Sequence, residues 1–281
     1  MILSAPRHIL TLTIATIACA AGADTVVTTF DGGADDGWVG PNGDDGFGGG
    51  TWVVPKGGNP TWNMRTVFND FGIPYINTSN ASFLGDYTSA DSITISVDLK
   101  VENLRFFGTN VSRPWVVQLC DVDGATGGYL WNSVWFKFAQ VSQATHGDWT
   151  TFSVTFDPKS TALPPGWRGT GAEDPVTYEP ILPPGVTFRD VLAGVDAIMF
   201  TTLEPGMFFG FTDHTISIDN ITLTRGAAPL GDLNGDSVVD GLDLTVLLAA
   251  WGPCAAPCTA DIDGDGTVGG LDLAALLASW S

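Results

Sequence analysis

Apolar and polar residues alternate most regularly in residues 92–101, where isoleucine, leucine or valine occupies every second position. A period of two places these side chains on one face of a β-strand and the polar ones on the other. Similar patterns predict strands over residues 25–30, 62–68, 115–120, 129–138, 149–156, 195–202 and 215–224, and a short helix over residues 188–193. Because Gly- and Pro-rich loops separate many short strands, we expect an antiparallel β-sandwich of jelly-roll type.

The last of these predicted strands changes phase in its middle. Every second residue is apolar up to Ile218, and the apolar phase then resumes one residue out of step. A β-bulge at Asp219 and Asn220 restores the register. Such a bulge would aim Asp219 at a cation, a third calcium ion, shared with Asp31 or Asp36. An ordinary edge bulge with solvated aspartates is the other interpretation, and the one that we favour.

Near the C-terminus the hydrophobic spacing changes to that of a helix. Leucines and a tryptophan recur at i, i+3, i+4 and i+7 in residues 244–251 and again in residues 273–280. Both segments belong to one repeat, because residues 231–252 (GDLNGDSVVDGLDLTVLLAAWG) align with residues 260–281 (ADIDGDGTVGGLDLAALLASWS) at an offset of 29. We therefore expect a loop followed by an amphipathic helix, used twice.

An acidic loop precedes each predicted helix. Counted from its first aspartate, the first loop has oxygen-bearing side chains at positions 1, 3, 5, 9 and 12, namely Asp232, Asn234, Asp236, Asp240 and Asp243. The second loop has Gly269 at position 9 and carboxylates at positions 1, 3, 5 and 12, namely Asp261, Asp263, Asp265 and Asp272. A hard cation takes six to eight oxygen ligands, and the backbone carbonyl at position 7, from Val238 or Thr267, adds one in each loop. This spacing predicts two calcium ions.

The duplicated loop and helix resembles the type I dockerin domain. The resemblance covers residues 231–281, and each unit is the loop-and-exit-helix (F-hand) half of an EF-hand, with Asp in place of Glu at position 12. It implies folding that depends on calcium, and docking to a cohesin-like protein or a surface component. In that family positions 10 and 11 often carry Ser or Thr, whereas this chain has Gly241-Leu242 and Gly270-Leu271. We interpret the two matched leucines as packing the units together; an apolar partner surface is the alternative.

The N-terminus has the pattern of a signal peptide over residues 1–23. Arg7 is followed by an apolar run over residues 9–21 and by the small-x-small pattern Ala21-Gly22-Ala23. We therefore expect a secreted or cell-surface protein with a β-sandwich domain over residues 24–226 and a dockerin-like domain over residues 227–281. No later segment approaches the roughly 18 apolar residues of a membrane helix. An uncleaved anchor and a lipoprotein linked through Cys19 are the alternatives.

The net charge indicates which classes of partner the chain can bind, and the cysteines indicate which disulfide it can form. The net charge of −20 argues against nucleic acid or an anionic membrane as partners, because both need a basic face, and it favours divalent cations or neutral ligands such as sugars. In an exported protein, the close pair Cys254 and Cys258 is predicted to form a disulfide, with a metal site as the weaker interpretation. Cys120 is then free, and its place in an apolar strand predicts burial.

Tryptophans near Gly-rich loops are the candidate sugar-binding residues. Aromatic faces stack on sugar rings, and Trp38, Trp52 and Trp62 are better placed for this than Trp135 or Trp149, which lie within predicted strands. Core packing is the competing interpretation for each. A glycosidase would need two opposed carboxylates, and no recognisable context surrounds the available ones, which are Glu102, Glu173, Asp174, Glu179, Glu204 and Asp213. We predict no catalytic residue.

The sequence thus predicts a secreted, non-catalytic protein with a carbohydrate-binding β-sandwich and a calcium-dependent, dockerin-like assembly module. A polysaccharide-degrading enzyme that carries a dockerin is the first alternative. A purely structural surface or matrix protein is the second.

Overall fold

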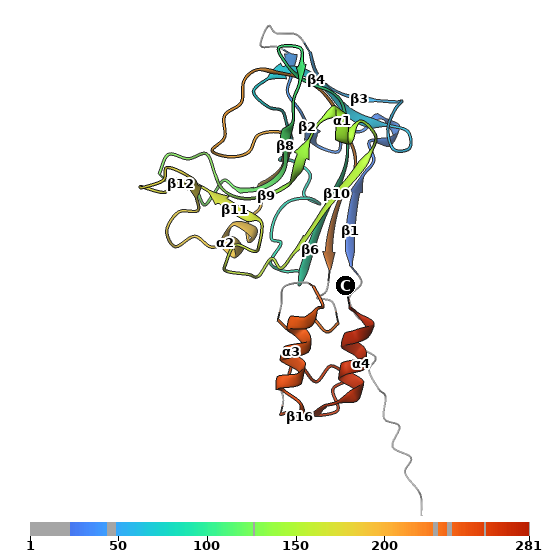
Figure 1. Ribbon diagram of the computed structural model, residues 1–281, viewed down its shortest axis with the longest axis vertical. Coiled ribbons are helices and arrows are strands. Elements are labelled where there is room, and N and C mark those ends of the chain that lie inside the picture. Colours follow the sequence, from blue (N-terminus) through green and yellow to red (C-terminus); the bar gives the residue numbers. More distant parts are fainter. Residues whose placement is uncertain are drawn as a thin grey trace, which may run out of the picture.

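The computed structural model describes residues 23–43, 49–125, 127–226, 230–234, 238–255 and 257–280. The predicted signal peptide therefore lies outside the described residues, except for Ala23. Figure 1 shows a β-sandwich with a small helical region below it. Among the described residues, no helix is long and apolar enough to cross a membrane.

Two antiparallel sheets form the sandwich. The first sheet contains β1 (Asp24–Thr28), β3 (Gly50–Val54), β4 (Asn63–Asp70), β6 (Ser92–Phe106), β7 (Thr109–Asn110), β10 (Thr150–Phe156) and β15 (Thr212–Gly226). The second sheet contains β2 (Trp38–Val39), β5 (Pro74–Asn77), β8 (Arg113–Asp121), β9 (Asn132–Val141), β11 (Trp167–Thr170) and β14 (Ala197–Thr201). The connections contain the 3-10 turn η1 (Asp31–Gly33), α1 (Gln143–His146), α2 (Phe188–Leu192) and a hairpin of β12 (Ala172–Glu173) and β13 (Pro180–Ile181).

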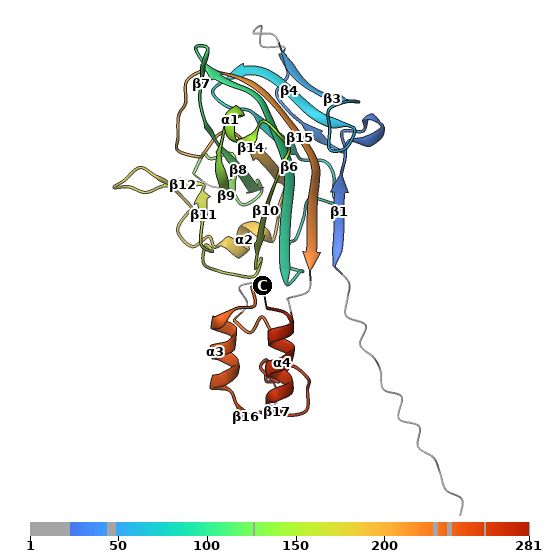
Figure 2. The same ribbon diagram turned by 45° about the vertical axis from the view of Figure 1, so that its right-hand side comes forward.

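The strand order is that of a jelly roll, as predicted. The first sheet runs β10-β6-β15-β4-β3, and the second runs β11-β9-β8-β14-β5-β2. Strands far apart in the chain pair in a nested way, β4 with β15 and β5 with β14, while the chain between them passes repeatedly from one sheet to the other. This nesting closes the chain into two stacked sheets, which Figure 2 shows from the side.

The core lies between the two sheets. In β6 the five alternating apolar residues Ile93, Ile95, Val97, Leu99 and Val101 are all fully buried. Across the core they face the aromatic rings of the second sheet, whose Trp115 and Phe200 stack with centroids 5.9 Å apart. Burial of each large apolar side chain stabilises the fold by about 1.5–3 kcal/mol, so this layer dominates the stability of the sandwich.

Each of the eight predicted strands coincides with an observed strand, and the predicted helix coincides with α2. Within the two sheets, the prediction missed β2, β3, β5, β7 and β11. These five strands are two to five residues long, and they contain or adjoin Gly or Pro, so their alternation is too short to detect.

The predicted bulge in the last strand is confirmed. The pairing of β15 with β6 shifts between Asp219 and Thr222, and Asn220 has the left-handed φ of 47°. Because of this shift, Ile218 and Ile221 are both fully buried although they are three residues apart.

The C-terminal region folds as two loop-helix units. The helices are α3 (Gly241–Ala249) and α4 (Gly270–Ala278), and the short strands β16 (Gly252–Pro253) and β17 (Thr267–Val268) pair between the units. Its small core consists of five buried residues, Val239, Leu247, Ala260, Val268 and Leu276. Cys254 and Cys258 form a disulfide, with their Cα atoms 6.1 Å apart. Cys120 is free and buried, as expected.

Candidate functional site

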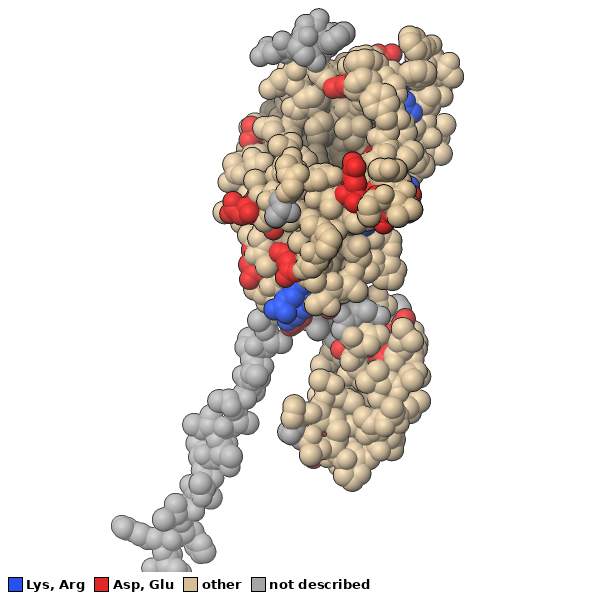
Figure 3. Space-filling view, turned by 90° about the vertical axis from the view of Figure 1, so that its left-hand side faces the viewer, with Lys and Arg blue, Asp and Glu red and all other residues tan. Residues whose placement is uncertain are grey.

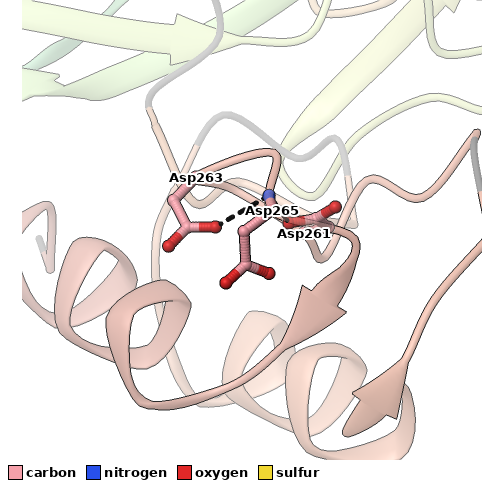
Figure 4. Close-up of side chains that lie close together, drawn as sticks. All are labelled: Asp261, Asp263 and Asp265. Carbon is pink, nitrogen blue, oxygen red and sulfur yellow. Dashed lines mark hydrogen bonds between the residues drawn. The ribbon is translucent and has the colours of Figure 1, made fainter.

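The second acidic loop gathers three of its predicted ligands. Oxygen atoms of Asp261, Asp263 and Asp265 lie within 4.8 Å of one another (Figure 4). Backbone N–H groups of the loop hold these side chains in place: that of Asp265 donates to Asp261 at 3.0 Å and to Asp263 at 3.1 Å, and that of Gly266 donates to Asp261 at 2.8 Å. The loop thereby directs several carboxylates at one point, which is the arrangement that calcium requires.

The carboxylate at position 12 of this loop accepts hydrogen bonds from backbone N–H groups of the loop. Asp272 is buried, and its Oδ1 accepts the N–H groups of Ile262 at 2.7 Å and Asp263 at 3.1 Å, while its Oδ2 accepts that of Gly269 at 2.7 Å. These donors, the N–H of Gly269 first, hold the pKa of Asp272 below its usual value. The pKa of Asp263 is raised: the N–H of Asp265 opposes the rise, while desolvation and the charges of the neighbouring carboxylates cause it.

The first loop repeats this architecture. Asp243 is buried, its Oδ1 accepts the N–H groups of Leu233 at 2.7 Å and Asn234 at 3.0 Å, and its Oδ2 accepts that of Asp240 at 2.9 Å. Asp240 also caps α3, because its Oδ1 accepts the N–H of Leu242 at 2.7 Å. The predicted ligands Asp232 and Val238 lie in the same loop, whereas Asp236 lies outside the described residues. Thr267 is in the second loop, at the exposed start of β17.

The leucines at position 11 of the two loops do not pack the units together. Leu242 is 61% exposed and Leu271 is 70% exposed, so our interpretation of them as packing residues is wrong. The core between the helices is made instead by residues five positions further along each helix, Leu247 and Leu276.

A second acidic group lies on the outer surface of the sandwich, at the bulge of β15. Asp219 is buried, and its carboxylate accepts the N–H groups of Asn59 at 2.6 Å and Asn220 at 2.7 Å. Burial raises the pKa of Asp219 to about 6, and the charges of Asp98 and Asp31 contribute to the rise. A cation bound here would relieve this repulsion, because its charge would neutralise carboxylates that burial shields from water.

Sequence reasoning missed Asp98 in this group. It lies opposite Asp219 in the β6–β15 pairing and is buried, although its position in β6 predicts a solvated outer face. The side chains of Asn59 and Asn220 donate to its Oδ2 at 2.9 and 2.8 Å. The charge of Asp31 acts on Asp219, whereas the backbone carbonyl of Asp36 accepts hydrogen bonds from the side-chain amides of Asn77 and Asn80. Only the register of β6 against β15 reveals the pairing.

The three predicted sugar-binding tryptophans have different surroundings. Trp38 is 1% exposed and packs against Phe83 and Phe200, so it belongs to the core and its assignment as a sugar platform is wrong. Trp62 is partly buried against the same core. Trp52 is half exposed and lines a pocket of about 200 Å³ together with Asp35, Asn42 and Thr51. Of these three tryptophans, only Trp52 presents the exposed ring surface that stacking on a sugar requires.

A further pocket, of about 240 Å³, lies over the outer face of the second sheet. Trp135 of β9 and Arg168 of β11 form its floor, where they are cross-strand neighbours and the guanidinium lies 5.8 Å from the ring centroid. The β12–β13 hairpin supplies Tyr178, and the connection after β14 supplies Glu204. The view onto this side shows a hollow with acidic side chains at its margin (Figure 3).

A hydrogen-bonded turn presents Tyr178 to solvent. Tyr178 is 75% exposed and has a φ of 60°, an unusual conformation for a bulky side chain. Asp174 organises the turn, because its carboxylate accepts the N–H groups of Val176 and Thr177, each at 2.8 Å. These donors, Thr177 first, lower the pKa of Asp174. Sequence reasoning missed that Tyr178 and Trp135 line the same pocket, because the two residues are far apart in the chain.

The carboxylates considered for catalysis are mostly engaged elsewhere. Glu102 pairs with Arg65, whose Nε donates to it at 2.8 Å, and Asp213 accepts the Asn69 amide at 2.5 Å. Glu179 and Glu204 line the same pocket as Tyr178. Both oxygens of Glu204 accept hydrogen bonds from Lys137 Nζ, at 3.1 and 2.9 Å.

Comparison with known proteins identifies the C-terminal region. Residues 230–278 match the family model described as the dockerin type I domain. No curated protein matches the chain.

Several solved structures are similar to the N-terminal part. The N-terminal CBM22-1-CBM22-2 tandem domain of Paenibacillus barcinonensis Xyn10C is 10% identical with a TM-score of 0.39, and the match covers 73% of this chain but only 47% of that chain. The CBM22-1 xylan-binding domain of the same protein is 11% identical with a TM-score of 0.39, over 74% of this chain and 98% of that chain. The family 30 carbohydrate-binding module of the cellulosomal cellulase Cel9D-Cel44B of Clostridium thermocellum is 12% identical with a TM-score of 0.35, over 71% and 92%.

The jelly-roll assignment itself rests on the strand order of the two sheets. The chain is therefore a dockerin-bearing protein, in which a type I dockerin domain follows a jelly-roll β-sandwich.

Proposed function

We propose that this is a secreted, non-catalytic protein that binds carbohydrate through its sandwich, over residues 24–226, and joins an assembly through its dockerin domain, over residues 227–281. The observation that carries the carbohydrate part is the pocket of Trp135, Arg168 and Tyr178. In this hollow the exposed ring of Tyr178 can stack on a sugar ring, whereas Trp135 is only 3% exposed and lies beneath the Arg168 guanidinium. The neighbouring carboxylates can accept hydrogen bonds from the sugar hydroxyl groups.

Calcium is the proposed cofactor, with one ion in each dockerin loop. The convergence of Asp261, Asp263 and Asp265 supports the ion of the second loop, and the matching hydrogen bonds of Asp243 and Asp272 support an equivalent site in the first. The position-12 oxygens retain unused lone pairs that can face an ion. In the sandwich, we propose a third ion at the bulge of β15, between Asp219 and Asp31. Asp98 is the third carboxylate of this acidic group.

The partner of the dockerin domain is a cohesin-like protein or another surface component. Exposure of Leu242 and Leu271 supports an apolar contact at the positions where the family often has Ser or Thr. A polysaccharide is the partner of the sandwich, and the acidic net charge disfavours nucleic acid.

A binding screen tests the carbohydrate proposal. The mature chain with calcium is mixed with soluble and insoluble xylan, cellulose and chitin, and both retention and released reducing sugar are recorded over a long incubation. We expect retention without product, and a loss of about tenfold in affinity for Tyr178→Ala, as is usual for truncation of an aromatic anchor. Val176→Ala, in the same exposed hairpin, is the matched control. Retention that is equal for both variants would exclude this pocket as the site.

One observation favours a polysaccharide-degrading enzyme as a second candidate: Glu179 and Glu204 line one pocket, as the two carboxylates of a glycosidase would. The ion pair of Glu204 with Lys137 argues against this, because a reacting carboxylate would have to leave its partner. Product that disappears in Glu204→Gln would establish the enzyme and overturn the non-catalytic proposal.

A further inference from the structure

Six phenylalanines gather at the end of the sandwich where β15 begins. They come from the turn after β4, the β6–β7 hairpin and the connection from β14 to β15. We name them the aromatic cap, which consists of Phe71, Phe106, Phe107, Phe208, Phe209 and Phe211.

Ring contacts join five of these phenylalanines into two sets, and the sixth, Phe209, lies under the guanidinium of Arg113. Phe71 lies 4.7 Å from Phe208 and 4.1 Å from Phe211, measured between ring centroids, and Phe106 lies 4.6 Å from Phe107. Gly210 connects the two sets: a Cβ atom on it would lie 2.2 Å from the ring of Phe106. The backbone of the loop therefore packs directly on that ring, which a side chain at this position would prevent.

Two rings of the cap are turned to solvent. Phe107 is 90% exposed and Phe208 is 79% exposed. Phe107 also has a φ of 46°, a backbone conformation that Asn or Gly adopts more easily than an aromatic residue. A large apolar ring in solvent and in an unfavourable conformation gives the free fold no stability, and exposed apolar patches of this kind are typical of binding surfaces.

The position of the cap indicates which ligand it meets. Met207 lines the pocket of Tyr178 and directly precedes Phe208, so the cap continues the margin of the proposed sugar pocket. Exposed polar residues lie beside the cap: Thr109 of β7, for example, is exposed and pairs with Phe106. The cap is also remote from the dockerin domain: β15 runs from it to Gly226, and 15 extended residues span roughly 50 Å (Figure 2). Docking through the tail leaves it free.

We propose that the aromatic cap is a second polysaccharide contact, which binds the apolar faces of sugar rings on the surface of an insoluble polysaccharide while the neighbouring pocket takes a single chain. The proposal rests on the carbohydrate-binding function proposed above. Phenylalanine rings suit the C–H faces of pyranose rings, the guanidinium that lies over the Phe209 ring belongs to the buried Arg113, and the cap is too far from the tail to serve its partner.

The test uses the full mature chain in calcium with insoluble xylan, cellulose and chitin, and with soluble oligosaccharides of the same sugars. For Phe107→Ala combined with Phe208→Ala, we expect about a tenfold loss of retention on the insoluble polysaccharide and unchanged affinity for the soluble one. Tyr178→Ala should weaken both. Leu130→Ala, another highly exposed apolar residue, is the matched control. Because the rings of Phe107 and Phe208 are both exposed, the melting temperature of the double variant should equal that of the wild type.

The outcomes separate the two proposals. If the wild-type chain binds none of the polysaccharides, both fail. If it binds and the cap variant is retained equally well on the insoluble material, the cap proposal fails while the pocket stands. An equal loss on soluble and insoluble ligands also overturns it, because the cap would then be part of the pocket. Self-association that the cap variant abolishes, with retention unchanged, would assign the surface to a second copy of the chain.

Discussion

Single buried side chains determine how this protein responds to acid. His214 lies in β15 with its ring fully inside the sandwich, 3.4 Å from the Thr202 hydroxyl, and its Nδ1 has no hydrogen-bond partner among the described residues. Burial lowers its pKa to about 4, and the charge of Arg113 contributes to the decrease. The native state therefore holds this imidazole neutral at pH values at which the unfolded chain protonates it.

We predict that the sandwich loses stability as the pH falls from about 6.5 to 4. In that window the unfolded state binds more protons at His214 than the native state does, so acid favours unfolding, by at most on the order of 3 kcal/mol. Urea unfolding at a series of pH values measures this loss. His214→Gln, which cannot titrate, should flatten this part of the pH dependence; a slope identical to that of the wild type would contradict the prediction.

At the same scale, one carboxylate of the second loop should control one calcium ion. Asp265→Ala removes an oxygen from the group with Asp261 and Asp263, so we expect the number of bound ions to fall from two to one by calorimetry. At a thousandfold excess of calcium over its Kd, the lost stabilisation is about 4 kcal/mol. Asp148→Ala is the matched control, because it removes the same charge at an exposed position of the sandwich. Two ions bound to both variants would refute the assignment.

At the scale of secondary-structure elements, the bulge of β15 combines a backbone requirement with a hydrogen-bonding one. Asn220 takes a left-handed φ of 47°, and its side-chain amide donates to the carbonyl of Asn59 at 2.7 Å and to Asp98 at 2.8 Å. The bulge thereby links β15, β6 and the loop before β4 around the buried Asp219.

We expect Asn220→Ala to destabilise the sandwich by about 2–3 kcal/mol, since it loses both hydrogen bonds and keeps a strained backbone. Asn220→Gly loses the same hydrogen bonds but relieves the strain, so it should be about 1 kcal/mol more stable than the alanine variant. Chemical denaturation of the two variants measures the difference. Equal stability of the two would show that the backbone conformation costs nothing here.

At the scale of the whole molecule, the two domains differ in what stabilises them. The sandwich has an extensive aromatic and aliphatic core, whereas the dockerin domain has five buried apolar residues and one disulfide. Residues 230–281 also carry eight aspartates and no Lys, Arg or His. Without bound cations these like charges repel one another across a small core.

We therefore predict two separate unfolding transitions, of which only the dockerin transition requires calcium. Chelation should abolish the dockerin transition in scanning calorimetry, and calcium should restore it, whereas magnesium, which keeps its water and demands a smaller octahedral site, should not. A dockerin transition that survives chelation would contradict this. A shift of the sandwich transition on chelation would in addition identify an ion at Asp219.

Local spacing in the sequence was sufficient for the features that depend on neighbouring residues. The alternation in β6, the phase change at Asp219 and the repeat of acidic loops and helices each arise within one or two elements, where geometry follows directly from the period. The family of the C-terminal domain could be recognised for the same reason, because its loop carries all its candidate ligands within twelve residues.

Pairing between distant segments decided the rest. Only the register of β6 on β15 brings Asp98 to Asp219, and only the packing of a hairpin over β9 brings Tyr178 to Trp135. Trp38 lies in the core and Leu242 lies at the surface. Whether a side chain is buried depends on which distant parts of the chain pack over it, and a local sequence pattern does not contain that information. The sequence by itself therefore determined the elements, the jelly-roll class and the calcium loops, while the tertiary structure alone decided which side chains share a surface, since those contacts join residues far apart in the chain.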